Sequence, residues 1–397
     1  MGIFNPCDIL LPKNADMHKW SVVACDQYTS EKEYWEKIDK EVGSFPSTLR
    51  LIFPEAYLDT VDFDSKVKEI NETMQSYLDS GIFSEYKNAF VFVKRTFPSG
   101  KVRHGIVGAV DLEEYNYKKD STSRIRATEA TVEDRLPPRV AIRRHAPVEL
   151  PHILMLIDDK KDSVMGKMKV KPPKKMLYDF DLSGNGGHIT GYLADDNATL
   201  MSAIDSLGTD PLIAVGDGNH SLAAAKKCWE ELKPTLTEEE KENHPMRFAL
   251  CEVVNLYEDS LVFEPIYRVF FGCDVAALLS ELKNTAGKYS YNIKCVTGEG
   301  EKTVSLKSDC HIESGAVTEF LEKYQKEHGG KIDYIHGEDT AESMGRCDGN
   351  IAFMVTCLEK GDLFKTVNTF GPLPKKTFSM GNANEKRFYT EARKLVR

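Results

Sequence analysis

The sequence predicts an α+β or mixed α/β protein with two lobes and mixed sheets flanked by helices. Three observations support this class. The chain has 397 residues, more than one hydrophobic core usually contains, so two or three lobes are expected. Residues 88–112 have the pattern of an antiparallel hairpin, and residues 188–232 alternate strand and helix patterns, as α/β units do.

The first predicted lobe spans residues 1–180. Hydroxyl and acidic residues at 29–31 are typical of a helix start, and Pro98-Ser99-Gly100-Lys101 is typical of a turn between two apolar strands. A lysine-rich stretch, 160–175, contains Pro172-Pro173 and predicts an exposed connection at the end of this lobe. The expected strands are 20–26, 88–97, 102–112 and 150–157, and the expected helices are 29–40 and 63–78.

The second predicted lobe spans residues 181–397. Its patterns alternate between short apolar runs and amphipathic stretches, and Thr237 is a candidate helix cap. Two of its apolar runs, 248–257 and 261–271, are expected to pair with each other. The other expected strands are 188–193, 211–215 and 351–357; the expected helices are 197–207, 221–232, 234–242, 275–284, 314–327 and a basic helix at the end of the chain.

A turn between a predicted strand and a predicted helix is the most informative segment. We call residues 215–221, Val-Gly-Asp-Gly-Asn-His-Ser, the glycine turn, and we expect a phosphate-binding segment over 215–225. Gly216 and Gly218 permit a tight turn, and a helix N-terminus offers free N–H groups and positive potential to a phosphate. Asp217 and His220 could serve there as base and acid. The spacing is neither a Walker loop nor the dinucleotide fingerprint, and an ordinary strand–helix connection is the alternative.

A second unusual segment, residues 124–139, mixes arginines with acids and threonines and has few apolar residues. Arginine forks suit the recognition of phosphate or carboxylate groups. A solvated charged helix is the alternative interpretation.

Composition limits the possible functions. The net charge of −10 disfavours general nucleic-acid binding, which needs a basic surface. The nine cysteines include no Cys-x-x-Cys pair, so neither a zinc ribbon nor a disulfide scaffold is expected. The first residues lack the pattern of a signal peptide, and no apolar run reaches the ~20 residues of a membrane helix. A cytoplasmic protein without a membrane partner is therefore expected.

Several motifs together resemble one family. Residues 217–224, Asp-Gly-Asn-His-Ser-Leu-Ala-Ala, resemble the Asp-Gly-His-His-Arg-x-x-Ala segment of the domain-of-unknown-function 1015 family. The resemblance extends, in the same order along the chain, to further segments. These are Phe4-Asn5-Pro6, Val23-Ala24-Cys25-Asp26, Thr128 to Arg135, Pro151 to Asp158, and Leu373-Pro374-Lys375-Lys376-Thr377-Phe378.

The glycine turn also resembles the phosphate-binding box of the ParB/sulfiredoxin fold, one branch of which contains free serine kinases. The resemblance implies a ParB/sulfiredoxin-like nucleotide-binding unit in this chain. It further implies a phosphotransferase that uses ATP or ADP with Mg²⁺ on a small amino acid, most readily L-serine or, in reverse, O-phosphoserine. Asn219 and Ser221 depart from the family's His and Arg, and the lost Arg removes a bidentate phosphate contact.

The resemblance assigns roles to individual residues. Asp217 and His220 are the expected catalytic residues. The phosphates of the nucleotide are expected to contact Gly216, Gly218, Asn219, Ser221, Arg124, Arg135 and Lys375. The candidates for holding a metal or the substrate ammonium group are Glu129, Glu133 and Asp134.

Three other functions are compatible with such a turn. A non-catalytic nucleotide-binding regulator would use the same phosphate contacts. A DNA-binding ParB-like regulator is disfavoured by the acidic composition and by the lack of a clear helix-turn-helix pattern. A sulfiredoxin-like reductase would need a reactive cysteine at the turn, whereas Cys228 lies about two helical turns further on. The sequence leaves the oligomeric state open.

Overall fold

The computed structural model describes residues 2–150 and 152–396, which form two compact units. Unit 1 contains residues 1–261 and 382–397, and unit 2 contains residues 262–381. This division differs from the predicted boundary at residue 180. The lysine-rich stretch 160–175 leads into β10 (Lys175–Asp181), which joins the same sheet as the preceding strands, so the chain does not leave unit 1 there.

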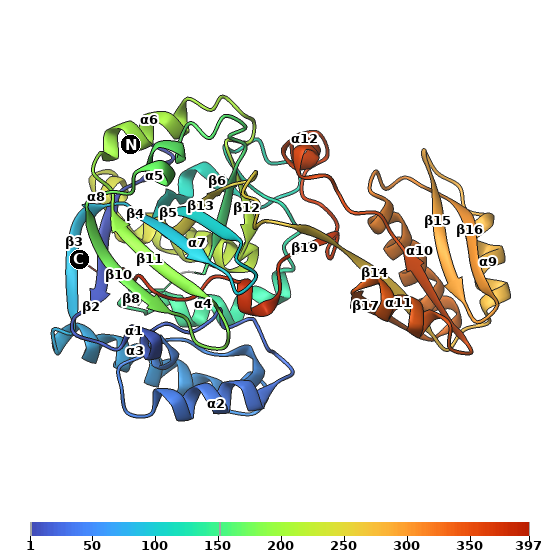
Figure 1. Ribbon diagram of the computed structural model, residues 1–397, viewed down its shortest axis with the longest axis horizontal. Helices are drawn as coiled ribbons and strands as arrows, with labels where there is room; N and C mark the ends of the chain where they lie inside the picture. The colour runs from blue at the N-terminus through green and yellow to red at the C-terminus, as the bar shows by residue number, and fades with distance from the viewer. Residues whose placement is uncertain (1, 151, 397) are drawn as a thin grey trace. The chain divides into compact units, whose positions relative to one another are not determined.

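Unit 1 is built on a mixed sheet (Figure 1). The hydrogen-bonded order is β10-β11-β4-β5-β13-β9-β12-β7-β6, and β1 also pairs with β5. The strands are β1 (Phe4–Asn5), β4 (Val91–Thr96), β5 (Val102–Asp111), β6 (Tyr115–Asn116), β7 (Ile125–Ala127), β9 (Leu154–Ile157), β11 (His188–Leu193), β12 (Ile213–Asp217) and β13 (Phe248–Asn255). Two smaller pairs join β2 (Cys7–Pro12) to β3 (Phe83–Ala89) and β8 (Val148–Glu149) to β20 (Arg393–Lys394).

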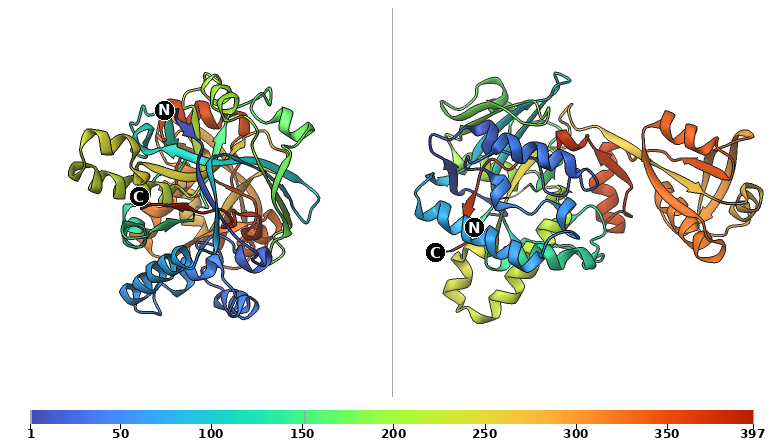
Figure 2. Two further views of the ribbon diagram at one scale, coloured as in Figure 1. Left: turned by 90° about the vertical axis from the view of Figure 1, so that its left-hand side faces the viewer. Right: turned by 90° about the horizontal axis from the view of Figure 1, so that it is seen from below.

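Helices surround this sheet, and the views agree that α2 and α3 lie on the same side of unit 1 (Figure 2). Helix α8 has the predicted cap, because Thr237 and Glu240 form a capping box. The helices are α1 (Met17–Trp20), α2 (Lys32–Val42), α3 (Phe63–Asp79), α4 (Leu136–Arg144), α5 (Gly166–Val170), α6 (Asn197–Asp205), α7 (Asn219–Leu232) and α8 (Glu238–Asn243). None of the described helices is long and apolar enough to cross a membrane.

The directions of four neighbouring strands determine which residues lie beside the glycine turn. Strand β12 runs parallel to β7 and antiparallel to β9. The carboxyl end of β12 therefore lies beside the residues that follow β7 and the residues that precede β9. Strand β13 runs parallel to β9, so Glu252, which faces Leu154 in the register, lies near the same end.

Helix α7 fixes the turn to the core. Leu222, Ala223 and Trp229 are buried in the cluster that also contains Val215 of β12, and α7 packs against α4. Burial of these apolar side chains is the main favourable term that holds a helix against a sheet.

Unit 2 has its own core and an antiparallel sheet of order β16-β15-β18-β14-β17, with β19 paired to β14. Its strands are β14 (Phe263–Phe271), β15 (Tyr289–Thr297), β16 (Gly300–Ser308), β17 (Lys331–His336), β18 (Asn350–Met354) and β19 (Phe378–Met380). Its helices are α9 (Val275–Lys283), α10 (Glu313–His328), α11 (Glu338–Gly345) and α12 (Leu363–Phe370). The predicted mixed α/β class is confirmed by both units.

Three predicted elements differ from the structure. The expected strand 20–26 instead contains the end of α1 and an isolated bridge at Val23. The runs 248–257 and 261–271 do not pair, because β13 and β14 belong to sheets of different units. The expected C-terminal basic helix is absent from the described residues 382–396, where Arg387 is ion-paired with Glu252 and Glu391 and Arg393 with Glu149. Pro151, inside the expected strand 150–157, lies outside the described residues, and the strand begins at Leu154.

The segment 382–396 returns to unit 1 and is held there by Arg95, whose side chain is 1% exposed. The Arg95 guanidinium donates five hydrogen bonds to main-chain carbonyls. Gly186 accepts two of them, and Asn384, Glu385 and Lys386 accept the others. The segment continues beside the N-terminal region, where Tyr389 donates its N–H to Val22 at 2.9 Å and Ala392 bridges Leu10.

Replacing Arg95 tests whether this buried guanidinium holds the returning segment. Arg95→Met leaves four buried or half-buried carbonyls without their donor, so we expect the free energy of unfolding to fall by about 3–5 kcal/mol. Chemical denaturation measures the loss, and Lys94→Met, at the exposed neighbouring position of β4, is the matched control. Equal stability of the two variants would contradict the assignment.

Candidate functional site

The glycine turn has the predicted strand–turn–helix geometry. Strand β12 ends at Asp217, Gly218 adopts a φ of +82°, and α7 begins at Asn219 without a side-chain cap. Gly216 is also required sterically, because a Cβ there would lie 2.8 Å from Cγ of Leu156. The first turn of α7 therefore presents main-chain N–H groups that no side chain caps, which is the arrangement that binds anions.

Asp217 is paired with a lysine that the sequence analysis did not identify. One Asp217 carboxylate oxygen accepts the N–H of Gly218 at 2.9 Å, and the other lies 3.2 Å from Nζ of Lys386. Both side chains are largely buried, with 27% and 17% exposure. Lys386 comes from the segment that Arg95 holds, so a residue 169 positions away in sequence, 386 minus 217, provides a positive charge at the turn.

His220 connects the turn to the arginine-containing segment. Its Nε2 accepts a hydrogen bond from the Val132 N–H at 3.2 Å. Burial lowers the pKa of His220 to about 4, and the positive charges of Arg139 and Arg135 act in the same direction. The imidazole is therefore neutral at pH 7, with its proton on Nδ1, which can donate to an acceptor.

His152 contacts the first turn of α7 through Ser221, as expected for a residue that precedes β9. Its Nε2 is 3.2 Å from Oγ of Ser221 and 3.5 Å from Oδ2 of Asp26, and its Nδ1 is 2.8 Å from the hydroxyl of Tyr389. Burial alone would lower the pKa of His152, but the Asp26 carboxylate outweighs burial and raises it. The surroundings therefore shift the pKa values of His152 and His220 in opposite directions.

Asp26 completes this second pair. Burial alone would raise the pKa of Asp26, but the charge and hydrogen bond of His152 lower it below its usual range, so the carboxylate stays ionised. Arg139 lies nearby and is ion-paired with Glu55, whose pKa is raised by burial against the opposing effect of Arg139. The groups around the turn therefore include ionised acids, a neutral imidazole and several cations.

The structure brings only part of the segment 124–139 to the glycine turn. Thr128 donates its hydroxyl hydrogen to the carbonyl of Val215, and Val132 contacts His220, as described. Arg135 adds positive potential at His220 from an exposed position, and the acids Glu133 and Asp134 in the same short helical turn are exposed as well. Half-buried Glu129 lies between Thr128 and Val132 in sequence.

Two predicted phosphate ligands have other positions. Arg124 precedes β7, and its carbonyl accepts the N–H groups of Leu212 and Ile213, so it lies at the opposite end of β12 from the turn. Its guanidinium is 3.4 Å from the carboxylate of Asp205. Lys375 belongs to unit 2, where its Nζ is 3.0 Å from Glu322.

The turn also offers oxygen ligands that fit a cation. The amide oxygen of Asn219 is buried and has no hydrogen-bond partner, directly after Asp217 and Gly218 in the chain. A carboxylate and an amide oxygen are ligands that Mg²⁺ accepts in proteins. Asp217 and Asn219 are therefore suitable residues to hold Mg²⁺ beside bound phosphates.

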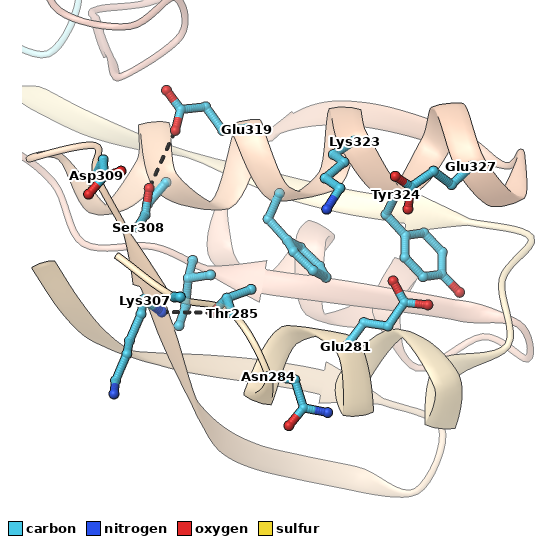
Figure 3. A pocket seen from close by; sticks show the side chains of 14 residues that line it. Glu281, Asn284, Thr285, Lys307, Ser308, Asp309, Glu319, Lys323, Tyr324 and Glu327 are labelled. Atoms are coloured by element: carbon cyan, nitrogen blue, oxygen red, sulfur yellow. Dashed lines mark hydrogen bonds between the residues drawn. The ribbon is translucent and has the colours of Figure 1, made fainter. Parts of the chain in front are cut away.

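Unit 2 has a separate pocket of about 540 Å³ between α9 and α10 (Figure 3). Glu281 of α9 and Glu327 of α10 point toward the same space, and Lys323 lies along it. His328 Nε2 is 3.0 Å from Glu281, and these two residues with Glu327 could together hold a metal ion, although all three are exposed. None of the residues predicted from the sequence to form the site lines this pocket.

Sequence reasoning missed Asp26, Arg139, His152, Lys386 and Tyr389. Asp26 and His152 lie inside segments that resemble the family, so the motifs marked these segments but did not indicate what the two residues do. Lys386 and Tyr389 gave none, because only the return of the chain to unit 1 places them at the turn. Cys228 does not support a reductase: it is buried, and burial raises the pKa of its thiol, so it lacks thiolate character.

The fold and the turn define a mixed α/β protein with an uncapped, electropositive helix N-terminus at the carboxyl end of an interior strand, β12. The chain belongs to the family described as "Protein of unknown function (DUF1015)", whose model matches residues 6–389. This match confirms the resemblance found in the motifs.

Comparison with curated proteins finds no match. Three solved structures have low similarity to this chain. A mutant of a free serine kinase in complex with ADP has 12% identity and a TM-score of 0.40, covering 74% of this chain and 93% of its own. A conserved hypothetical protein from Pyrococcus furiosus has 12% identity and a TM-score of 0.35, with 72% and 94% coverage. SbnI with C-terminal truncation from Staphylococcus aureus has 10% identity and a TM-score of 0.36, with 70% and 83% coverage.

The two histidines at the turn should titrate on opposite sides of the ordinary value of 6.5. Histidine NMR signals, assigned with His220→Gln and His152→Gln, should give a midpoint near 4 for His220 and one above 6.5 for His152. The neutral form of His220 stabilises the fold above pH 6.5, and this contribution is lost as the pH falls through about 4. The charged form of His152 stabilises the fold below pH 6.5. This contribution is lost as the pH rises through the pKa of His152 in the folded state. Coincident midpoints would contradict the two environments.

Proposed function

We propose that the glycine turn binds the phosphates of ATP or ADP and that the protein transfers a phosphoryl group to the hydroxyl of a small amino acid. The motif resemblance implies L-serine as the simplest acceptor, with O-phosphoserine as the donor in the reverse direction. The observation that carries the proposal is the uncapped N-terminus of α7, which has the neutral His220 in its first turn and Lys386 paired with the preceding Asp217. The motif resemblance to the phosphate-binding box of free serine kinases supports the same conclusion.

The phosphate contacts follow from the donors present. The N–H groups of Asn219, His220 and Ser221 point out of the first turn of α7, where the helix dipole favours negative charge. His220 can add a hydrogen bond from Nδ1. A phosphate at this position competes with Asp217 for Lys386, so we expect the Asp217–Lys386 ion pair to open when the nucleotide binds.

The transfer step needs a proton acceptor and positive charge. The acceptor hydroxyl oxygen forms a bond to the terminal phosphorus, the bond from phosphorus to the leaving nucleotide oxygen breaks, and that oxygen keeps the electron pair. Asp217, released from Lys386, accepts the hydroxyl proton or binds the cation; ionised Asp26 beside His152 is a second proton acceptor. Mg²⁺ held by Asp217 and Asn219 would neutralise charge on the phosphate oxygens.

Lys386, Arg135 and Arg139 are cations beside the turn that can stabilise charge on the transferred group. Glu129, Glu133 and Asp134 remain the candidates for binding the substrate ammonium group. Because Glu133 and Asp134 are exposed, they can reach a ligand only at the rim of the site.

A phosphoryl-transfer assay on the full chain tests the proposal, with Mg²⁺, ATP or ADP, and a panel of amino acids. We expect Asp217→Asn to lower kcat by at least about 100-fold and to change nucleotide affinity little, because the variant removes a base or metal ligand and keeps the amide donors. His220→Ala should weaken nucleotide binding by about tenfold, because one hydrogen bond to a charged group is lost. Asp120→Asn, at an exposed position, is the control.

The outcomes separate the candidate functions. Turnover that disappears in Asp217→Asn supports the phosphotransferase. Nucleotide binding that depends on His220, without transfer to any acceptor, indicates a regulatory nucleotide-binding protein. Absence of nucleotide binding contradicts the proposal and leaves the turn as a structural connection.

A further inference from the structure

A cavity of about 130 Å³ lies in unit 1 beside the first turn of α7. Ser221 in that first turn and Ala224 one turn later both line it, so it begins at the helix N-terminus and continues along α7. The opposite wall comes from α4 and from residues that precede α3.

The walls of the cavity are mainly apolar. Leu51, Phe53, Met74, Ile142, Ala224 and Leu395 contribute side chains to it. Apolar cavities of about this volume bind hydrocarbons of the size of benzene. A serine side chain, one methylene and one hydroxyl, would leave these walls without a partner.

The polar groups of the cavity are suited to a hydroxy acid. Ser221, His152 and Tyr389 form the hydrogen-bonded chain described above, and all three line the cavity. Arg143 lines it as well: its terminal nitrogens bind Glu149 and the carbonyl of Phe248, but its Nε is buried and has no hydrogen-bond partner.

We infer that the cavity holds the side group of the phosphoryl acceptor, and that the preferred acceptor is a hydroxy amino acid with a branched or aromatic group larger than the side chain of serine. This inference rests on the proposed function and refines its acceptor. The acceptor hydroxyl lies at the N-terminus of α7 and the apolar group lies toward Ala224. The hydroxyl oxygen forms the new bond to phosphorus, the nucleotide oxygen leaves with the electron pair, and the hydroxyl proton passes to a carboxylate of the site.

A graded series of acceptors tests the inference on the full chain, with ATP or ADP and Mg²⁺. The acceptors are L-serine, L-threonine and 3-phenylserine. Each buried methylene strengthens an apolar contact by about fourfold, so we expect kcat/KM to rise by at least about tenfold from serine to 3-phenylserine.

Two variants change the volume of the cavity in opposite directions. Ala224→Leu fills it and should lower the ratio of kcat/KM for 3-phenylserine over serine by about tenfold or more. Ile142→Ala enlarges it and should raise that ratio, which keeps the test valid if Ala224→Leu does not fold. Ala198→Leu introduces the same change on the exposed surface of α6 and is the control.

Two results would overturn the inference separately from the proposed function. Serine as the best acceptor, with the ratio unchanged in Ala224→Leu and Ile142→Ala, shows that the acceptor does not enter the cavity while phosphoryl transfer stands. Transfer to none of the acceptors, at any variant, contradicts the proposed function itself, and the inference with it.

Discussion

The site in unit 1 depends on the buried guanidinium of Arg95. The chain leaves unit 1 after Leu261 and returns at Asn382, and Arg95 binds the returning main chain through the carbonyls of residues 384–386. The planar guanidinium donates hydrogen bonds in fixed directions, so it sets both the position and the direction of the main chain that it binds. A lysine ammonium group has no such fixed geometry. The same segment then places Lys386 at Asp217 and Tyr389 at His152.

The electrostatics of the turn follow from this assembly. Two imidazoles lie at the first turn of α7, His220 within it and His152 against Ser221, and their neighbours shift their pKa values in opposite directions. Partial burial lowers the pKa of His220, and Arg139 and Arg135 act in the same direction, whereas Asp26 outweighs burial at His152 and raises its pKa. His220 is therefore a neutral hydrogen-bond donor, whereas the pKa of His152 is shifted upward, toward the charged form.

Local patterns in the sequence were sufficient to predict the glycine turn, α7, the hairpin of β4 and β5, and α3 from its first residue, Phe63. These elements depend on short-range properties: apolar period, caps and turn residues. The direction of β9, which brings His152 to the turn, and the return of residues 382–396 are set by pairing between distant strands. No local pattern encodes such pairing, so neither the position of Arg124 at the other end of β12 nor the division of the chain after Leu261 could be predicted.

The central claim is that the N-terminus of α7 binds phosphate, and amide NMR with ADP tests it most directly. Titration of ADP with Mg²⁺ into the ¹⁵N-labelled full chain should shift the amide signals of residues 218–221 and of Lys386 in a saturable way. The shifts should weaken at high salt, because the contact is between an anion and positive groups. Signals at residues 218–221 that stay unchanged while ADP binds elsewhere, or does not bind, would contradict the account.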